Sequence, residues 1–222
     1  MNRYVVEFSK DGYIRYTSHL DLLRLFKRAF KKTGVEPDYS HGFNPHPKMS
    51  FTQPLSLGYS SKCESIEFDT AGDFTTEEIV RKLSSVMPKG LTITGCFTRD
   101  IKAKPLAAEV EAAVYAVHFS TTPYEDKFVK LTSDYLAQPQ IIAAKRQKKT
   151  KKMADVDIKA KIRGIEALND HGMLVLRMTL DCGSTSNLSP EQVISSYISF
   201  CGLDVKRWDV DVTREKMIFI NK

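Results

Sequence analysis

Apolar residues recur every three or four positions in four segments of the chain, which predicts four amphipathic helices. Each segment opens with a serine or threonine that is followed three residues later by an acidic residue or a glutamine, the pattern of a helix-capping box. The expected helices begin at Ser18, Thr75, Thr122 and Ser189. Gly34 and Gly202 are expected to end the first and the fourth, because glycine readily takes the left-handed conformation of a helix terminus.

Short segments rich in β-branched and aromatic residues lie between these helices and predict strands. In the first half the expected strands are residues 4–9, 48–52, 63–69 and 91–97, and Asp11-Gly12 predicts a hairpin turn into a further short run at 13–16. In the second half they are residues 110–120, 140–145, 156–168, 173–181 and 205–213, with a turn at Asp170-His171-Gly172.

The order of these elements predicts an α+β fold. Strands and helices follow the order βαββαβ in each half, which is typical of two tandem ferredoxin-like sandwiches, each an antiparallel sheet with two helices on one face. The expected domains are residues 1–104 and 109–222, with a linker around 98–108. Residue-level similarity between the halves is weak, so the duplication rests on element order alone.

Composition narrows the class of protein. The chain has 222 residues, 42% of them hydrophobic, and no apolar run approaches the roughly 18 residues of a membrane span. The amino terminus lacks the apolar core of a signal peptide, so we expect a cytoplasmic protein without a membrane partner. The four cysteines form no CxxC pair, and we expect structural thiols with no metal site and no cofactor. They are Cys63, Cys96, Cys182 and Cys201.

Charge is concentrated in one tract. The net charge is +6, and six positive charges fall within residues 145–152, which we expect to form a basic hairpin or loop. Such a tract could contact nucleic-acid phosphates with salt-dependent affinity, or could be a solvated hairpin tip. The candidate nucleic-acid-binding residues are Lys145, Arg146, Lys148, Lys149, Lys151 and Lys152.

The segment from Tyr39 to Phe51 combines histidines, an asparagine, a lysine and two prolines in one short connection. Proline fixes φ and glycine permits unusual dihedrals, so a rigid loop is expected, with Phe43 covered by other side chains. Rigid polar loops often carry binding and catalytic groups. The candidate ligand-binding residues are Arg15, Asn44, His46 and Lys48, and the candidate catalytic residues are His19, His46 and Lys48.

The same residues also have purely structural interpretations. His19 could be a surface group beside the cap, and Asn44 could shape an Asx turn. The basic residues of the first helix could extend an RNA footprint or form a solvated face. The third strand of each half lacks the basic and aromatic signature of an RNA-recognition motif, so stacking of bases on the sheet face is disfavoured.

Three runs resemble one family: Ser18-His19-Leu20-Asp21-Leu22, then residues 42–51, GFNPHPKMSF, then residues 54–58, PLSLG. They are similar to an uncharacterised bacterial family encoded beside, or fused to, cobalamin-binding radical SAM proteins. The family commonly carries glutamine where this chain has His41, which argues against an essential role for His41. The resemblance implies a radical SAM protein as partner. This chain lacks three closely spaced cysteines, so the iron–sulfur chemistry would belong to that partner.

These features predict a non-catalytic accessory or binding module that recognises an anionic substrate such as RNA. One alternative is a metal-independent RNA-cleaving or RNA-processing enzyme in which His19, His46 and Lys48 converge for acid–base chemistry. Another is a protein-only adaptor for the radical SAM partner.

Overall fold

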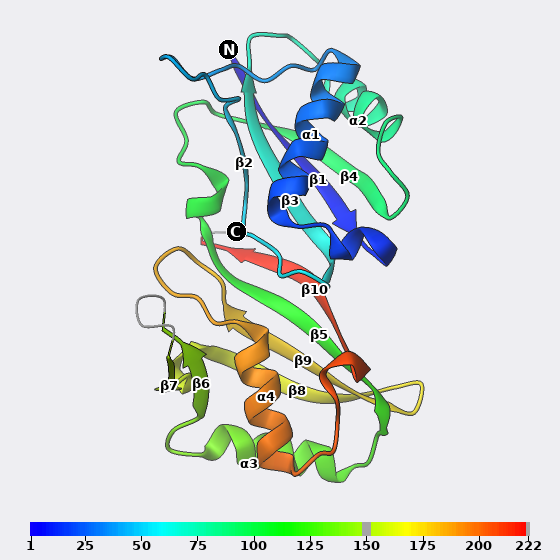
Figure 1. The fold of residues 1–222 in the computed structure, drawn as a ribbon, viewed down its shortest axis with the longest axis vertical. Helices are drawn as coiled ribbons and strands as arrows, with labels where there is room; N and C mark the ends of the chain where they lie inside the picture. Colours follow the sequence, from blue (N-terminus) through cyan, green and yellow to red (C-terminus); the bar gives the residue numbers. More distant parts are fainter. Residues whose placement is uncertain (148–151, 221–222) are drawn as a thin grey trace. The chain divides into compact units, whose positions relative to one another are not determined.

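The computed structural model describes residues 1–147 and 152–220, and it has a mixed α+β fold (Figure 1). Those residues contain four α-helices. The strand pairs β1–β3, β1–β4, β2–β3, β5–β9, β6–β7 and β8–β9 are all antiparallel. The chain divides into two compact units, Met1–Val110 and Glu111–Lys222, called unit 1 and unit 2. None of the described helices is both long and apolar enough to span a membrane.

Unit 1 is a four-stranded sheet with two helices on one face (Figure 1). The strands lie in the order β4-β1-β3-β2, and each neighbouring pair is antiparallel. The elements in chain order are β1 (Asn2–Lys10), a 3-10 helix (Gly12–Tyr16), α1 (His19–Thr33), β2 (Met49–Phe51), β3 (Ser60–Thr70), α2 (Thr76–Ser84), β4 (Leu91–Arg99) and a 3-10 turn (Leu106–Ala108).

Unit 2 contains a sheet in the order β10-β5-β9-β8, in which β9 is antiparallel to both β5 and β8. A separate two-stranded sheet, β6–β7, is called the ribbon. The elements are β5 (Val110–Pro123), α3 (Lys127–Ala137), β6 (Ile142–Arg146), β7 (Met153–Asp157), a 3-10 turn (Lys159–Lys161), β8 (Ile162–Asp170), β9 (Met173–Asp181), α4 (Pro190–Cys201), a 3-10 turn (Arg207–Asp209) and β10 (Val210–Phe219).

Three of the four predicted helix starts are confirmed. The Ser18 hydroxyl accepts a hydrogen bond from the Asp21 amide, the Thr75 hydroxyl accepts one from the Glu78 amide, and α4 follows Ser189 directly. The third start, at Thr122, is wrong. Residues up to Pro123 continue β5, and the next amide, of Tyr124, donates to the Gly172 carbonyl at the β8–β9 turn. Pairing with a distant strand therefore outweighs the local capping signal.

Two further predictions are wrong because of tertiary contacts. Residues 13–16 form a 3-10 helix and not a strand, since the β1–β4 pairing ends at Lys10 and the Asp11 amide turns to the Gly90 carbonyl. The single strand expected at 156–168 is two strands, β7 and β8. The chain bends between them where the Asp157 carboxylate accepts the backbone amides of Ile141 and Lys159.

Aromatic packing fixes the position of α1 in unit 1. Phe26 and Phe30 of α1 are fully buried, and the Phe30 and Phe68 ring centroids are 4.7 Å apart. Phe8 of β1 lies 5.0 Å from Phe26, centroid to centroid. Burial of each such ring contributes about 1.5–3 kcal/mol relative to exposure. The opposite, polar side of α1 is therefore held firmly toward solvent.

Candidate functional site

Residues 39–48, called the 39–48 loop, are closed at their base like a hairpin. Tyr39 and Pro47 form an isolated antiparallel bridge. The Ser40 amide donates to the His46 carbonyl at 2.8 Å, and the His46 amide donates to the Ser40 hydroxyl at 2.9 Å. The Lys48 amide donates to the Asp38 carbonyl at 2.6 Å. These bonds hold the base of the loop in one conformation, whereas its tip projects from the fold.

The tip carries an aromatic side chain in open solvent. Phe43 is fully exposed, so the prediction that other side chains cover it is wrong. Tyr39, at the base, is 53% exposed. Gly42 has φ of +124°, a conformation that other residues avoid, and it lets the chain turn just before Phe43. His41, Asn44 and His46 are exposed on the same loop.

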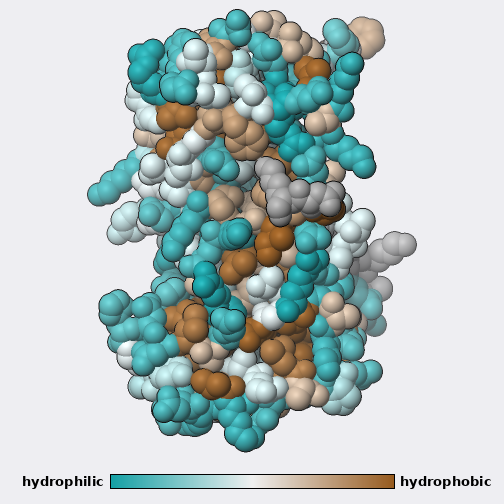
Figure 2. Space-filling model, turned by 180° about the vertical axis from the view of Figure 1, so that it is seen from behind, coloured by the Kyte–Doolittle hydropathy of each residue, from teal (hydrophilic) through white to brown (hydrophobic). Residues whose placement is uncertain are grey.

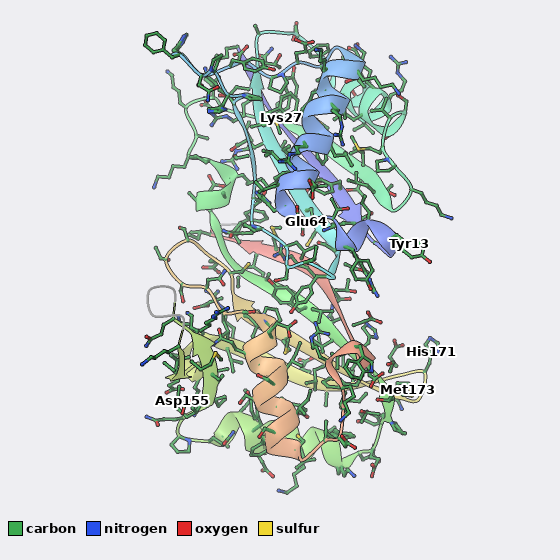
Figure 3. The ribbon with its side chains drawn as sticks, in the orientation of Figure 1. Tyr13, Lys27, Glu64, Asp155, His171 and Met173 are labelled. Carbon is green, nitrogen blue, oxygen red and sulfur yellow. The ribbon has the colours of Figure 1, made fainter. Side chains whose placement is uncertain are left out.

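A pocket of about 200 Å³ lies between α1 and the chain on either side of the 39–48 loop, and we call it the α1 pocket. Its apolar floor includes Phe30, which is 1% exposed, and Met49. Lys27 and Lys31 lie one helical turn apart on its α1 side, and Figure 3 labels Lys27 on that helix. The complete lining is Lys27, Phe30, Lys31, Glu36, Pro37, Tyr39, Pro47 and Met49.

The charges of the α1 pocket are not neutralised by neighbours. Within the described part of the chain, Lys27, Lys31 and Glu36 make no side-chain ion pair within 4.0 Å, whereas Arg24 on the same helix pairs with Asp21 at 2.8 Å. The exposed basic face of α1 consists of Arg24, Lys27, Arg28, Lys31 and Lys32. We call this face and the 39–48 loop together the loop surface. It places two exposed aromatic rings on the same unit as five cations.

Lys48 faces a different hollow, of about 280 Å³, on the other side of β2. Its neighbours there include Arg3, Glu67 and Asp69. Arg3 binds Asp69 through two hydrogen bonds, of 2.7 and 3.1 Å, and this bond is the main cause of the raised pKa of Arg3. The Leu106 amide donates to the Glu67 carboxylate at 3.1 Å. The segment after β4 is thereby fastened over the helix-free face of the unit 1 sheet.

His19, His46 and Lys48 do not lie together. His19 is the first residue of α1 and packs its ring against Phe51, with centroids 5.1 Å apart. It lies roughly 18 Å along the helix axis from Lys31, which lines the pocket beside the loop. Phe51 packs against Phe8 and Phe26 in the unit 1 core, whereas Lys48 lines the hollow beside Arg3 and Asp69.

Arg15 lies at the His19 end of unit 1. It belongs to the 3-10 helix immediately before α1, and its Nη2 donates to the Tyr16 hydroxyl at 2.8 Å. The structure therefore brings Arg15 together with neither His46 nor Lys48. Of the four ligand-binding candidates, Asn44 and His46 share the exposed loop and Lys48 lines the hollow behind it.

The described residues of the basic tract lie at the end of the ribbon where Arg146 of β6 pairs with Met153 of β7. Lys145, Arg146 and Lys152 are exposed, and Arg146 pairs in register with Met153, which is 63% exposed. The inner side of the ribbon rests on α4 through Ala143, and the Ser196 hydroxyl donates to the Ile142 carbonyl at 3.2 Å. Lys148, Lys149 and Lys151 lie outside the described residues.

A shallower hollow of about 390 Å³ lies on unit 2, where Val114, Ile165, Arg177 and Lys216 are among the lining residues. Figure 2 shows hydrophobic and hydrophilic atoms mixed over this unit. The Arg177 guanidinium pairs with Glu215 at 3.1 Å. This hollow has no exposed aromatic ring among its lining residues, so it is a weaker candidate for nucleic acid than the loop surface.

Metal and thiol chemistry find no support in the described residues. No three histidine, cysteine or acidic side chains there are grouped so that they could hold a metal ion. The cysteines are free thiols. Burial raises the pKa of the Cys96 thiol to about 12, so this thiol is protonated and unreactive near neutral pH.

Sequence comparison identifies the family. A model of a family described as uncharacterized proteins conserved in bacteria, DUF2344, matches residues 3–190. The chain belongs to the DUF2344 family. Functionally curated proteins give no match to this DUF2344 chain.

Solved structures resemble the DUF2344 chain at the level of fold. A chain in the crystal structure of a Cbf5–Nop10–Gar1 complex is similar with a TM-score of 0.52 and 13% identity. The similarity covers 99% of this chain and 50% of that one, so the DUF2344 chain spans half the length of its structural neighbour. An unknown protein from Galdieria sulphuraria, aligned over 98% of both chains at 13% identity, has a TM-score of only 0.28.

Two features of the site were not foreseen from the sequence. Glu36 was not a candidate, and its position in the α1 pocket depends on the fold: its carbonyl accepts the Thr70 hydroxyl at 2.8 Å. The Phe43 ring was expected to be covered by other side chains, but it is exposed. The spacing of Lys27 and Lys31, four residues apart on a predicted helix, was the one available signal for this pocket.

Proposed function

We propose that this DUF2344 protein is a non-catalytic accessory module that binds single-stranded RNA. The observation that carries the proposal is the exposed Phe43 ring on a loop with a fixed base, on the same unit as the basic face of α1. Proteins that bind single strands combine aromatic rings, on which bases stack, with cations that follow the phosphates. The loop surface has both components.

The unit 1 sheet is a poor platform for RNA by comparison. Its helix-free face carries Arg3, Glu67 and Asp69, and the segment around Leu106 is hydrogen-bonded to Glu67. Acidic side chains repel phosphates, and the covering segment blocks base stacking on this face. This supports contact through the loop surface.

The strand orders support a duplicated frame. If the four main strands of each unit are numbered 1 to 4 along the chain, β4-β1-β3-β2 in unit 1 and β10-β5-β9-β8 in unit 2 both have the spatial order 4-1-3-2. We propose that each unit is a ferredoxin-like sandwich and that the ribbon is an insertion after α3 in the second. The ribbon would then supply a separate basic surface for phosphates.

We also propose a radical SAM protein as the cytoplasmic partner of this module. The motifs around His19 and the 39–48 loop support this through their resemblance to proteins encoded beside such enzymes. Co-expression of the tagged chain with the radical SAM protein encoded beside its gene tests the pairing. Recovery of the two together after ribonuclease treatment is expected, and recovery only before the treatment would mean that RNA, and not direct contact, joins them.

The test of RNA binding uses fluorescence anisotropy with a labelled 12-nucleotide RNA. Phe43→Ala is expected to weaken binding by about tenfold, since stacking of one base contributes roughly 1–3 kcal/mol. Tyr13→Ala is the matched control, because Tyr13 is 95% exposed but lies in the 3-10 helix before α1 (Figure 3). Equal effects of the two changes, or no RNA binding by the unchanged protein, would contradict the proposal.

The same samples test the absence of catalysis. After prolonged incubation the RNA is expected to remain intact on a denaturing gel. Cleavage that disappears in a His46→Ala variant would favour the enzymatic alternative. The separation of His19 from the 39–48 loop argues for intact RNA, because an acid–base pair must reach the same phosphate.

A further inference from the structure

We propose that the α1 pocket binds one ribonucleotide of the RNA and selects ribose over deoxyribose through Glu36. This inference rests on the proposed RNA-binding function and adds the chemical class of the bound unit. The pocket volume of about 200 Å³ is below the roughly 300–1,000 Å³ of sites for drug-sized ligands, so a single nucleotide unit is the appropriate scale.

The walls of the pocket match the parts of a nucleotide. Phe30 and Met49 form an apolar floor, and the Tyr39 ring stands at the rim, where a base can lie against it. Lys27 and Lys31 place two ammonium groups on one wall, one helical turn apart. Ammonium groups on adjacent turns can contact the non-bridging oxygens of one phosphate. A base and a phosphate can therefore be held at the same time.

Glu36 supplies the third element, a hydrogen-bond acceptor. Its backbone is anchored because its carbonyl accepts the Thr70 hydroxyl of β3, and the next residue, Pro37, is buried. Its carboxylate has no ion-pair partner within 4.0 Å in the described chain, although it lines the same pocket as two lysines. A ribose 2′-hydroxyl can donate to this carboxylate. Deoxyribose has no such donor, so no hydrogen bond from the sugar would offset the repulsion between the carboxylate and the nearby phosphate.

The charges of the pocket support the same ligand. Two lysines and one glutamate give a formal charge of +1, from 2 − 1, which balances the single negative charge of a phosphodiester. A purely anion-binding pocket would not need an acidic side chain in its wall. The mixture of cations and one acceptor is suited to a ligand that has both a phosphate and a hydroxyl group.

The test compares a 12-nucleotide RNA with DNA of the same sequence by anisotropy. The unchanged protein is expected to bind RNA about tenfold more tightly than DNA, the effect of one hydrogen bond to a charged group. Glu36→Ala should bring the RNA-to-DNA ratio close to one by weakening RNA binding and strengthening DNA binding. Asp73→Ala, which removes an exposed acid on the loop before α2, should leave the ratio unchanged.

A second pair of variants tests the lysines. Lys27→Ala with Lys31→Ala should weaken RNA and DNA alike, because both backbones carry phosphates, whereas Lys89→Ala with Lys102→Ala should change neither. Equal thermal unfolding curves for all variants would exclude misfolding as the cause. An RNA-to-DNA ratio that is the same in the unchanged protein and in Glu36→Ala overturns this inference. The wider RNA-binding proposal would still stand if Phe43→Ala weakened binding of the labelled RNA and Tyr13→Ala did not.

Discussion

The loop surface of unit 1 and the ribbon of unit 2 are both basic, but they differ in what lies beneath the charges. Lys27 and Lys31 stand on a helix that is anchored by Phe26 and Phe30 in an aromatic core. Lys145 and Arg146 stand on a two-stranded sheet whose residues are mostly exposed. The first surface has a pocket and exposed aromatic rings, whereas the described strands of the second carry exposed charges and no aromatic residue.

Under the proposed RNA-binding function, this difference sets what each surface would recognise. Side chains held over a packed core keep fixed distances from one another, so they can match the spacing of a base, a sugar and a phosphate. Charges on an exposed ribbon attract any phosphate backbone and discriminate little between sequences or sugars. In the proposed function the loop surface would therefore select the ligand and the ribbon would attract it electrostatically.

The largest expected difference between the two surfaces is in stability, and it appears when the Phe30 ring at the floor of the α1 pocket is removed. Phe30→Ala should lower the free energy of unfolding by about 3–5 kcal/mol, because it opens a cavity in the unit 1 core. Met153→Ala on the ribbon should change it by less than about 0.5 kcal/mol, since that side chain is 63% exposed. Urea denaturation followed by circular dichroism measures both. Similar losses in the two variants would contradict the contrast between the surfaces.

Reversing the ribbon charges should act on affinity and not on stability. The change of Lys145, Arg146 and Lys152 to glutamate is expected to weaken RNA binding by about tenfold at low salt. It should also make the dependence of log K on log salt shallower by up to roughly 2, because three phosphate contacts are lost. Phe43→Ala should leave this slope unchanged. An unaltered slope in the ribbon variant would show that the ribbon does not touch RNA.

The backbone of the 39–48 loop gives a smaller and sharper test. Gly42→Ala should destabilise the native loop by about 1 kcal/mol, since φ of +124° is strained for any residue with a side chain. Gly164→Ala is the matched control, because Gly164 has no positive φ and no atom within 4 Å of the added carbon. The control is expected to be neutral or slightly stabilising. Thermal unfolding measures the difference, and equal shifts would contradict it.

The smallest expected effect concerns the base of the ribbon. Hydrogen bonds from the amides of Lys159 and Ile141 hold the pKa of Asp157 below its ordinary value of 3.8. Because the folded pKa is the lower one, these bonds stabilise the ribbon base above about pH 4 and lose their effect as the pH falls through 3.8 and below.

Amide hydrogen exchange measures this effect at Ile141 and Lys159. Protection there should decrease on acidification in the unchanged protein, and it should already be low in Asp157→Ala at neutral pH. Asp155→Ala, on the same strand (Figure 3), is the control and should keep the protection. Equal protection in the two variants would show that Asp157 does not hold the ribbon base.

Local signals predicted much of the fold. The capping residues Ser18 and Thr75 make the expected bonds, and Gly34 and Gly202 end their helices in the left-handed conformation. Strand β9, at 173–181, has the predicted bounds. These features depend on neighbours in the chain, so short-range patterns suffice to predict them. The start of α3 was missed because β5 continues through Thr122 and Pro123 to reach the β8–β9 turn.

The sequence by itself determined the α+β composition of the chain, the basic tract and the unusual residues of the 39–48 loop, because these follow from residue type and spacing. Only the tertiary structure decided which of those residues meet. It separated His19 from the loop by the length of α1, exposed Phe43, and placed Glu36 in a pocket with Lys27 and Lys31. The physical reason is that a pocket is made by contacts between segments distant in sequence, and the packing of β3 against α1, through Phe68 and Phe30, sets those contacts.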